Sequence, residues 1–154
     1  MRRQGANTSV ILLTVLLIAG CGSDKADASK ARLQAMAGGQ LKDVVPVSGK
    51  VLVDGEPASG VLLRLWSKES DSPRKSALSG ANGKYCWSTN STCDGIVPGE
   101  YKVTFKRLKN PKKDTSEDLF AGRYSDVSQS KYELTVVAGT SQTNVDYDLK
   151  SKSE

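Results

Sequence analysis

Apolar and polar side chains alternate with a period of two beyond residue 45, and this pattern constrains the fold most. In the segment 101–106, Tyr, Val and Phe alternate with Lys, Thr and Lys. Side chains two residues apart lie on the same face of a strand, so the alternation predicts a strand with one buried face. Similar patterns predict seven short strands, at 47–53, 61–66, 74–79, 84–89, 101–106, 132–136 and 144–149.

Turn-forming residues separate the predicted strands. Asp-Gly-Glu-Pro occupies 54–57, Gly-Ala-Asn-Gly occupies 80–83, and Pro-Gly occupies 98–99. No gap between strands contains the long helical pattern that a parallel crossover needs. We therefore expect an all-β fold, a seven-stranded antiparallel β-sandwich.

The N-terminus has the order of a secretory signal. Arg2 and Arg3 precede an apolar run at 10–19, which ends in Gly20 and Cys21. Ten helical residues rise about 15 Å, half of a hydrocarbon core of roughly 30 Å, so the run is too short for a permanent span. We expect 1–20 to be a signal peptide.

The end of this segment carries a resemblance. Leu-Ile-Ala-Gly-Cys at 17–21 resembles the lipobox of bacterial lipoproteins. The resemblance implies that Cys21 carries a diacylglycerol through a thioether and that the mature chain begins there. It also implies that the lipid anchors the protein to a membrane. Gly22 and Ser23 follow instead of an aspartate, which favours the outer membrane, on its periplasmic or surface-facing side. The alternative is a plain secretory signal cut nearby.

A segment rich in small and charged residues follows the cysteine. It has few large apolar groups, so it cannot bury enough surface to offset chain entropy, and we expect a flexible tether. Helix-forming residues at 26–37 are marginal for an isolated helix. The predicted organisation is a signal peptide at 1–20, a lipidated tether at 21–45, a β-sandwich domain at 46–150 and a tail at 151–154.

The strand region also resembles a known family. Val-Ser-Gly-Lys-Val at 47–51, Asp-Gly-Glu-Pro at 54–57, Asn-Gly-Lys-Tyr at 82–85 and Val-Pro-Gly-Glu-Tyr-Lys-Val at 97–103 look like carboxypeptidase regulatory-like domains. These domains have the transthyretin-like (prealbumin-like) β-sandwich fold. The resemblance covers about 46–149 and departs at 79–81, where Ser-Gly-Ala stands in place of the usual Thr-Asp. It implies a fold and no peptidase activity.

Two cysteines remain once Cys21 is acylated. Cys86 and Cys93 would lie in an oxidising compartment, where an even pair favours a disulfide. Closing a loop of about eight residues contributes on the order of 2.5 kcal/mol in the chain-entropy model. The alternatives are a zinc half-site, which lacks His or Cys partners, and a redox pair, which normally has two intervening residues.

A basic run at 106–113 leads into an acidic run at 114–118. The run could contact anionic lipid headgroups or an acidic envelope polymer, at about 1 kcal/mol per basic residue near a charged surface. The alternative is a solvated loop whose acidic half cancels much of the positive electrostatic field of its basic half. The candidate contacts are Lys106, Arg107, Lys109, Lys112 and Lys113.

The sequence contains no histidine, which argues against most enzyme mechanisms. There is no imidazole base, no His-dependent triad and no His-based metal site. The acidic residues also lack the spacing of a calcium loop. We therefore expect no catalytic residues, no metal and no cofactor.

Charge gives a weak indication of the partner. The formal net charge of +5 falls to about +3 when Arg2 and Arg3 leave with the signal, too little to predict nucleic-acid binding. We expect a lipid-anchored, non-catalytic envelope module that binds an envelope protein or polymer. The alternative is a small-ligand carrier or sensor that uses the inter-sheet space or a dimer seam.

Overall fold

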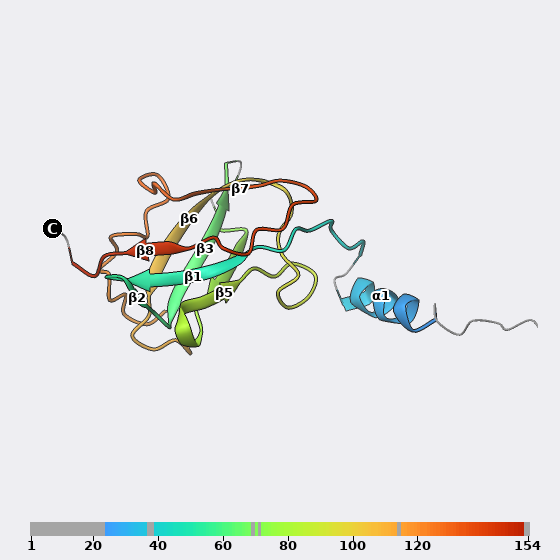
Figure 1. Ribbon diagram of the computed structural model, residues 1–154, viewed down its shortest axis with the longest axis horizontal. Helices are drawn as coiled ribbons and strands as arrows, with labels where there is room; N and C mark the ends of the chain where they lie inside the picture. Colours follow the sequence, from blue (N-terminus) through green and yellow to red (C-terminus); the bar gives the residue numbers. More distant parts are fainter. Residues whose placement is uncertain (1–23, 37–38, 69, 71, 114, 153–154) are drawn as a thin grey trace, which may run out of the picture.

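The structure, a computed structural model, describes residues 24–36, 39–68, 70, 72–113 and 115–152. Within these residues the chain is mostly β, with its strands in two sheets that form a sandwich-like arrangement (Figure 1). The elements in order are α1 (Asp24–Met36), β1 (Ser48–Val53), β2 (Glu56–Pro57), β3 (Val61–Ser67), β4 (Lys75–Leu78), the 3-10 helix η1 (Ala81–Gly83), β5 (Lys84–Cys86), β6 (Gly99–Arg107), β7 (Glu133–Val136) and β8 (Tyr147–Leu149).

Strand β1 is the centre of the first sheet. β2 and β5 pair with it antiparallel, and β8 pairs with it parallel, opposite the β2 side. The prediction of a purely antiparallel sandwich is therefore wrong at β8. A tight hairpin forces antiparallel pairing, but β8 follows a crossing from β7 in the other sheet, so no hairpin fixes its direction.

The second sheet has the order β4-β3-β6-β7 and is antiparallel throughout. In its register Leu63 faces Phe105 and Leu65 faces Val103. These four side chains are at most 1% exposed, so the inward face predicted from the alternation is the one that packs between the sheets.

Within the described residues there are eight strands instead of the predicted seven, and the last begins at 147 instead of 144. Two of the differences lie at turns. A two-residue strand, β2, forms where a turn was predicted, because Asp54 and Gly55 both adopt positive φ, 55° and 85°. That geometry closes a tight hairpin. Strand β5 ends at Cys86 instead of 89, because the Gly95 amide donates to the Trp87 carbonyl (3.0 Å) and turns the chain into a loop.

Helix α1 occupies most of the segment predicted as a flexible tether. Its residues are mainly Ala, Lys, Arg, Leu, Gln and Met, which are strong helix formers. At 29–36 its side chains are exposed apart from the half-buried Leu33, and Met36 is 85% exposed. Local propensity, rather than packing on the sandwich, therefore accounts for this helix.

Large side chains fill the space between the sheets. Trp87 is fully buried, and the Phe105 ring lies 4.9 Å from the Tyr147 ring and 5.0 Å from the Tyr132 ring. Each of these aromatic residues buries a large apolar area. The core cluster joins both sheets through Val51, Val53, Val61, Leu63, Leu65, Val103, Leu134, Val136 and Leu149.

One glycine permits the close approach of β1 to the segment that precedes β8. A Cβ on Gly49 would collide with the Val145 carbonyl. Val145 cannot move away freely, because its amide donates to the Ser48 carbonyl (3.1 Å) and its carbonyl accepts from the Tyr85 hydroxyl (2.7 Å).

We expect Gly49→Ala to lower the free energy of unfolding by about 1–3 kcal/mol, the usual cost of overpacking. Urea denaturation measures this change. Gly80→Ala is the matched control, because a Cβ there meets its nearest atom, the Lys84 carbonyl oxygen, at 3.8 Å. Equal stability of the two variants would contradict the close-approach argument.

Candidate functional site

The predicted lipidation site lies outside the described residues, as does the whole predicted signal peptide at 1–20. Within the described residues, no helix is long and apolar enough to cross a membrane. The lipid anchor thus stays a prediction.

The two remaining cysteines lie at disulfide distance. The Cα atoms of Cys86 and Cys93 are 5.3 Å apart, within the usual range for a bridged pair. Within the part of the chain that the structure describes, no group of three or more His, Cys, Asp or Glu side chains gathers as a metal site would. The bridge joins the end of β5 to the far side of the following loop.

The Asp94 carboxylate holds this loop together. It accepts hydrogen bonds from the backbone amides of Thr89 (2.7 Å), Asn90 (2.8 Å) and Ser91 (3.0 Å). Partial burial raises the pKa of Asp94, but these hydrogen bonds outweigh burial and hold the pKa below its usual value. The loop is therefore ordered by an ionised side chain as well as by the cysteine pair.

The same loop fixes the chain that enters the sandwich. The Asn90 side-chain amide donates to the Lys42 carbonyl (2.9 Å), and the Lys42 amide donates to Asn90 Oδ1 (3.1 Å). Beyond this pair, Val45 and Ile96 exchange two backbone hydrogen bonds (2.8 and 3.0 Å). The Lys42 side chain therefore projects from a backbone that hydrogen bonds hold in place.

The structure does not bring the predicted basic contacts together on one face. Lys106 and Arg107 are neighbours on β6, so they point to opposite faces, and the other predicted contacts lie in the following loop. Lys109 forms an ion pair with Glu117 (2.8 Å), and the Arg107 amide donates to Asp118 (2.9 Å). The side-chain hydrogen bond between Glu117 and Lys109 lowers the pKa of the acid and raises the pKa of the base.

A different group of cations lines a hollow at the opposite end of β6. This hollow, which we name the basic groove, has a volume of about 400 Å³. Leu65 and Ile96, each 1% exposed, lie at its floor. Among the described residues, three cations and no carboxylate line it: Lys42, Arg74 and Lys75.

Hydrogen bonds orient the groove's arginine. The Arg74 amide donates to the Leu65 carbonyl (2.7 Å), and its Nε donates to the Ser67 hydroxyl (3.2 Å). Within the described residues, no carboxylate lies within ion-pair distance of Arg74. Its two terminal nitrogens are the atoms with which a guanidinium binds an acidic group in a fork geometry.

A tyrosine completes the groove wall. The Tyr101 hydroxyl donates to the Val97 carbonyl (2.8 Å), which holds the ring against the rim. Burial raises the pKa of Tyr101, and the nearby Arg74 charge opposes that effect. The groove thus combines an apolar floor, a neutral hydroxyl and three cations.

Sequence reasoning did not find this groove. Its cations come from the entering segment and from the start of β4, more than thirty residues apart in sequence. The run at 106–113 is conspicuous because its basic residues are close together in the sequence, whereas folding brings the basic residues of the groove together. The signal in the sequence was the Arg74-Lys75 pair at the start of a strand.

Comparison with protein-family models finds no match to this chain, and comparison with curated proteins finds no significant match. The functional interpretation therefore rests on the residues and their geometry.

We expect Asp94→Ala to destabilise the protein in a pH-dependent way. A lowered folded-state pKa contributes stability above the unfolded pKa of about 3.9, and this contribution is lost as pH falls through the folded pKa. Urea unfolding at pH 6 and at pH 3 measures the difference between wild type and variant. The difference should shrink at the lower pH.

The control for this prediction is Asp43→Ala, because the described residues give the Asp43 carboxylate no hydrogen bond. That variant should match wild type at pH 6. A loss of stability in Asp94→Ala that is equal at both pH values would contradict the role of the ionised carboxylate.

Proposed function

We propose that this chain is a lipid-anchored, non-catalytic module of the bacterial cell envelope that binds an acidic envelope protein or polymer through the basic groove. The domain would be a transthyretin-like, carboxypeptidase regulatory-like β-sandwich, held to the outer membrane through Cys21. The observation that carries the binding role is a groove that three cations, and no carboxylate of the described residues, line.

The filled core supports binding at the surface. Aromatic and aliphatic side chains of both sheets occupy the inter-sheet space, with Trp87 and Phe105 at most 1% exposed. An internal carrier needs a cavity of roughly 300–1,000 Å³ that encloses its ligand. The basic groove reaches the core only at its floor, so the interaction module is the better interpretation.

Charge supports an acidic partner. Cations clustered around a hollow attract acidic groups from a distance and raise the association rate. The apolar floor adds area that a partner can bury. An acidic chain with small apolar groups therefore fits the groove better than a neutral one.

The place of the groove agrees with an anchor. Lys42 lies where the chain enters the sandwich, and α1 precedes it, whereas the last strand, β8, points toward the opposite end of the sandwich (Figure 1). A chain anchored at Cys21 would reach the membrane from the side of the molecule that carries the groove.

The acidic side chains support a non-catalytic role. Asp54 accepts a hydrogen bond from the Ser151 amide, Asp94 holds its loop, and Asp126 accepts from the Ser128 amide. The pKa of Asp54 is lowered by its bonds to Ser151, and the pKa of Asp126 by its bonds to Ser128. The pKa of each of these three carboxylates is held low by hydrogen bonds to its own loop or turn, whereas a general acid needs a pKa near neutral pH.

We expect Cys21→Ser to release the protein from the membrane fraction, because lipidation by more than one acyl chain is what makes anchoring stable. Fractionation of cells and immunoblotting measure the distribution. Cys93→Ser is the control, since it removes a cysteine but leaves the anchor. A Cys21→Ser protein that stays in the membrane fraction would contradict the lipoprotein proposal.

We expect a photo-cross-linking amino acid at Val97, on the groove rim, to capture one acidic partner in intact cells. The double variant Arg74→Glu and Lys75→Glu should reduce this product at least tenfold, because it reverses two of the three cations. Mass spectrometry and gel quantification measure the product.

Leu119 is the control position, because it is 48% exposed and lies in the loop beyond the other end of β6. It should not give the same product. A Val97 product that survives the charge reversal, or the absence of any product, would contradict the binding proposal.

A further inference from the structure

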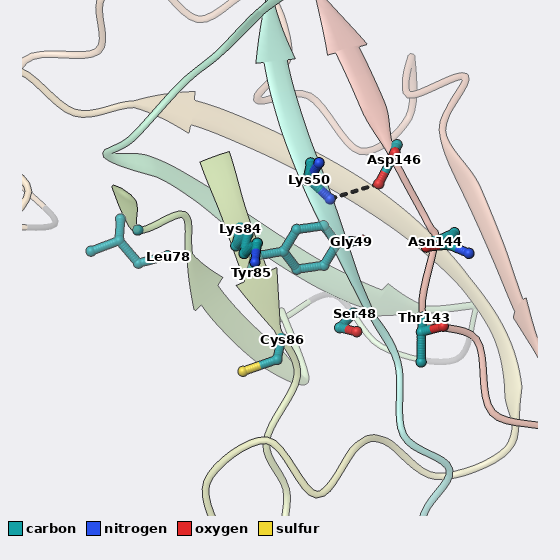
Figure 2. Close-up of a pocket in the computed structure, with 11 residues that line it drawn as sticks. Ser48, Gly49, Lys50, Leu78, Lys84, Tyr85, Cys86, Thr143, Asn144 and Asp146 are labelled. Atoms are coloured by element: carbon teal, nitrogen blue, oxygen red, sulfur yellow. Dashed lines mark hydrogen bonds between the residues drawn. The ribbon is translucent and has the colours of Figure 1, made fainter. Parts of the chain in front are cut away.

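A second hollow lies on the outer face of the first sheet and contains two neighbouring lysines. This hollow, which we name the lysine hollow, has a volume of about 710 Å³ and is bordered by β1, β5, the end of β4 and the segment before β8 (Figure 2). It shares no lining residue with the basic groove. The lysine hollow and the basic groove are therefore separate sites.

Lys50 and Lys84 lie directly opposite each other on adjacent antiparallel strands. Residues in such a pair project from the same face, with Cβ atoms about 4.5–5.5 Å apart. Like charges in this arrangement destabilise a sheet. The described residues place no carboxylate within ion-pair distance of either ammonium group.

An acidic side chain in the lining of the hollow accepts a hydrogen bond from the backbone. Asp146 Oδ1 accepts a hydrogen bond from the Lys50 backbone amide (2.7 Å), the bond drawn in Figure 2. This bond ties one carboxylate oxygen to the backbone of β1, and within the described residues Asp146 forms no ion pair with either lysine. An external anion between the lysines would relieve their repulsion.

The hollow also offers neutral hydrogen-bond donors. The hydroxyls of Ser48 and Thr143 and the side-chain amide of Asn144 belong to its lining. Figure 2 shows Thr143 and Asn144 on one side of β1 and Lys84 and Cys86 on the other. Donors from two sides of a strand suit a compact anion with several acceptor oxygens.

The floor of the hollow is rigid. Gly49 lies against the Val145 carbonyl, and the Tyr85 hydroxyl donates to that same carbonyl (2.7 Å). Cys86 is directly opposite Ser48 in the sheet and lies at disulfide distance from Cys93. A rigid floor lowers the ordering cost of binding.

We propose that the lysine hollow binds a phosphate group, held between Lys50 and Lys84. A phosphate carries more charge than a carboxylate and presents more acceptor oxygens, so it matches two cations and several neutral donors. Binding removes the like-charge repulsion, so it stabilises the folded state by linkage. The site is distinct from the basic groove and its partner.

The test uses the full chain, purified in a non-ionic detergent, with inorganic phosphate as the probe and sodium chloride at equal ionic strength as reference. Phosphate should raise the Tm of wild type and shift the backbone amide resonances of residues 48–50 and 84–86. Acetate at the same concentration should give less than a third of the shift. An equal response to acetate or chloride overturns the phosphate assignment.

The Lys84→Gln variant distinguishes phosphate binding at the lysine pair from a general effect of the protein's net charge. Without phosphate this variant should have a Tm a few °C above wild type, because the repulsion is gone. It should also bind phosphate at least tenfold more weakly. Lys102→Gln, on β6 and in the lining of neither hollow, is the matched control and should respond to phosphate as wild type does.

Two results with these variants overturn the proposal. One is a phosphate response in Lys84→Gln equal to that of wild type. The other is a loss of response in Lys102→Gln as large as in Lys84→Gln. The cross-link from Val97 should be unchanged in Lys84→Gln, so failure of the phosphate site and failure of the proposed function are distinguishable.

Discussion

The pairing of β1 on both of its edges is the constraint on which the rest of the structure depends. β5 and β2 occupy one edge, and the C-terminal segment that ends in β8 occupies the other. The close approach at Gly49 brings that segment near enough for the Val145 carbonyl to accept from Tyr85. The walls of the lysine hollow follow from this pairing, because they come from both sides of β1.

Carboxylates complete backbone hydrogen bonding where the strands end or turn. Asp146 accepts from the Lys50 amide, Asp148 from the Gly55 amide (3.2 Å), and Asp94 from three loop amides. Buried or half-buried amides need such acceptors. The chain has 22 basic and 17 acidic residues, so basic side chains outnumber acidic ones.

The fold was predictable where one face of a strand is buried. The alternation over 101–106 predicts the inward positions of Val103 and Phe105, and the Cys86–Cys93 pair lies at disulfide distance. Strand direction was not predictable for β8, because a crossing between sheets leaves either direction open. The basic groove was not predictable either, because Lys42 and Arg74 become neighbours of one hollow through long-range packing.

The lysine pair illustrates the same limit in another way. Alternation alone places Lys50 and Lys84 on outward faces, but only the register makes them direct neighbours. A one-residue slip of β5 would separate them, yet it would also turn Tyr85 out of the core, where it lies against Trp87 and Tyr147. The aromatic packing therefore enforces a repulsive pair on the opposite face. The core thus imposes a repulsion between two lysines that lowers the stability of the free protein and that a bound anion would relieve. Local sequence rules are expected to fail in this way at functional sites.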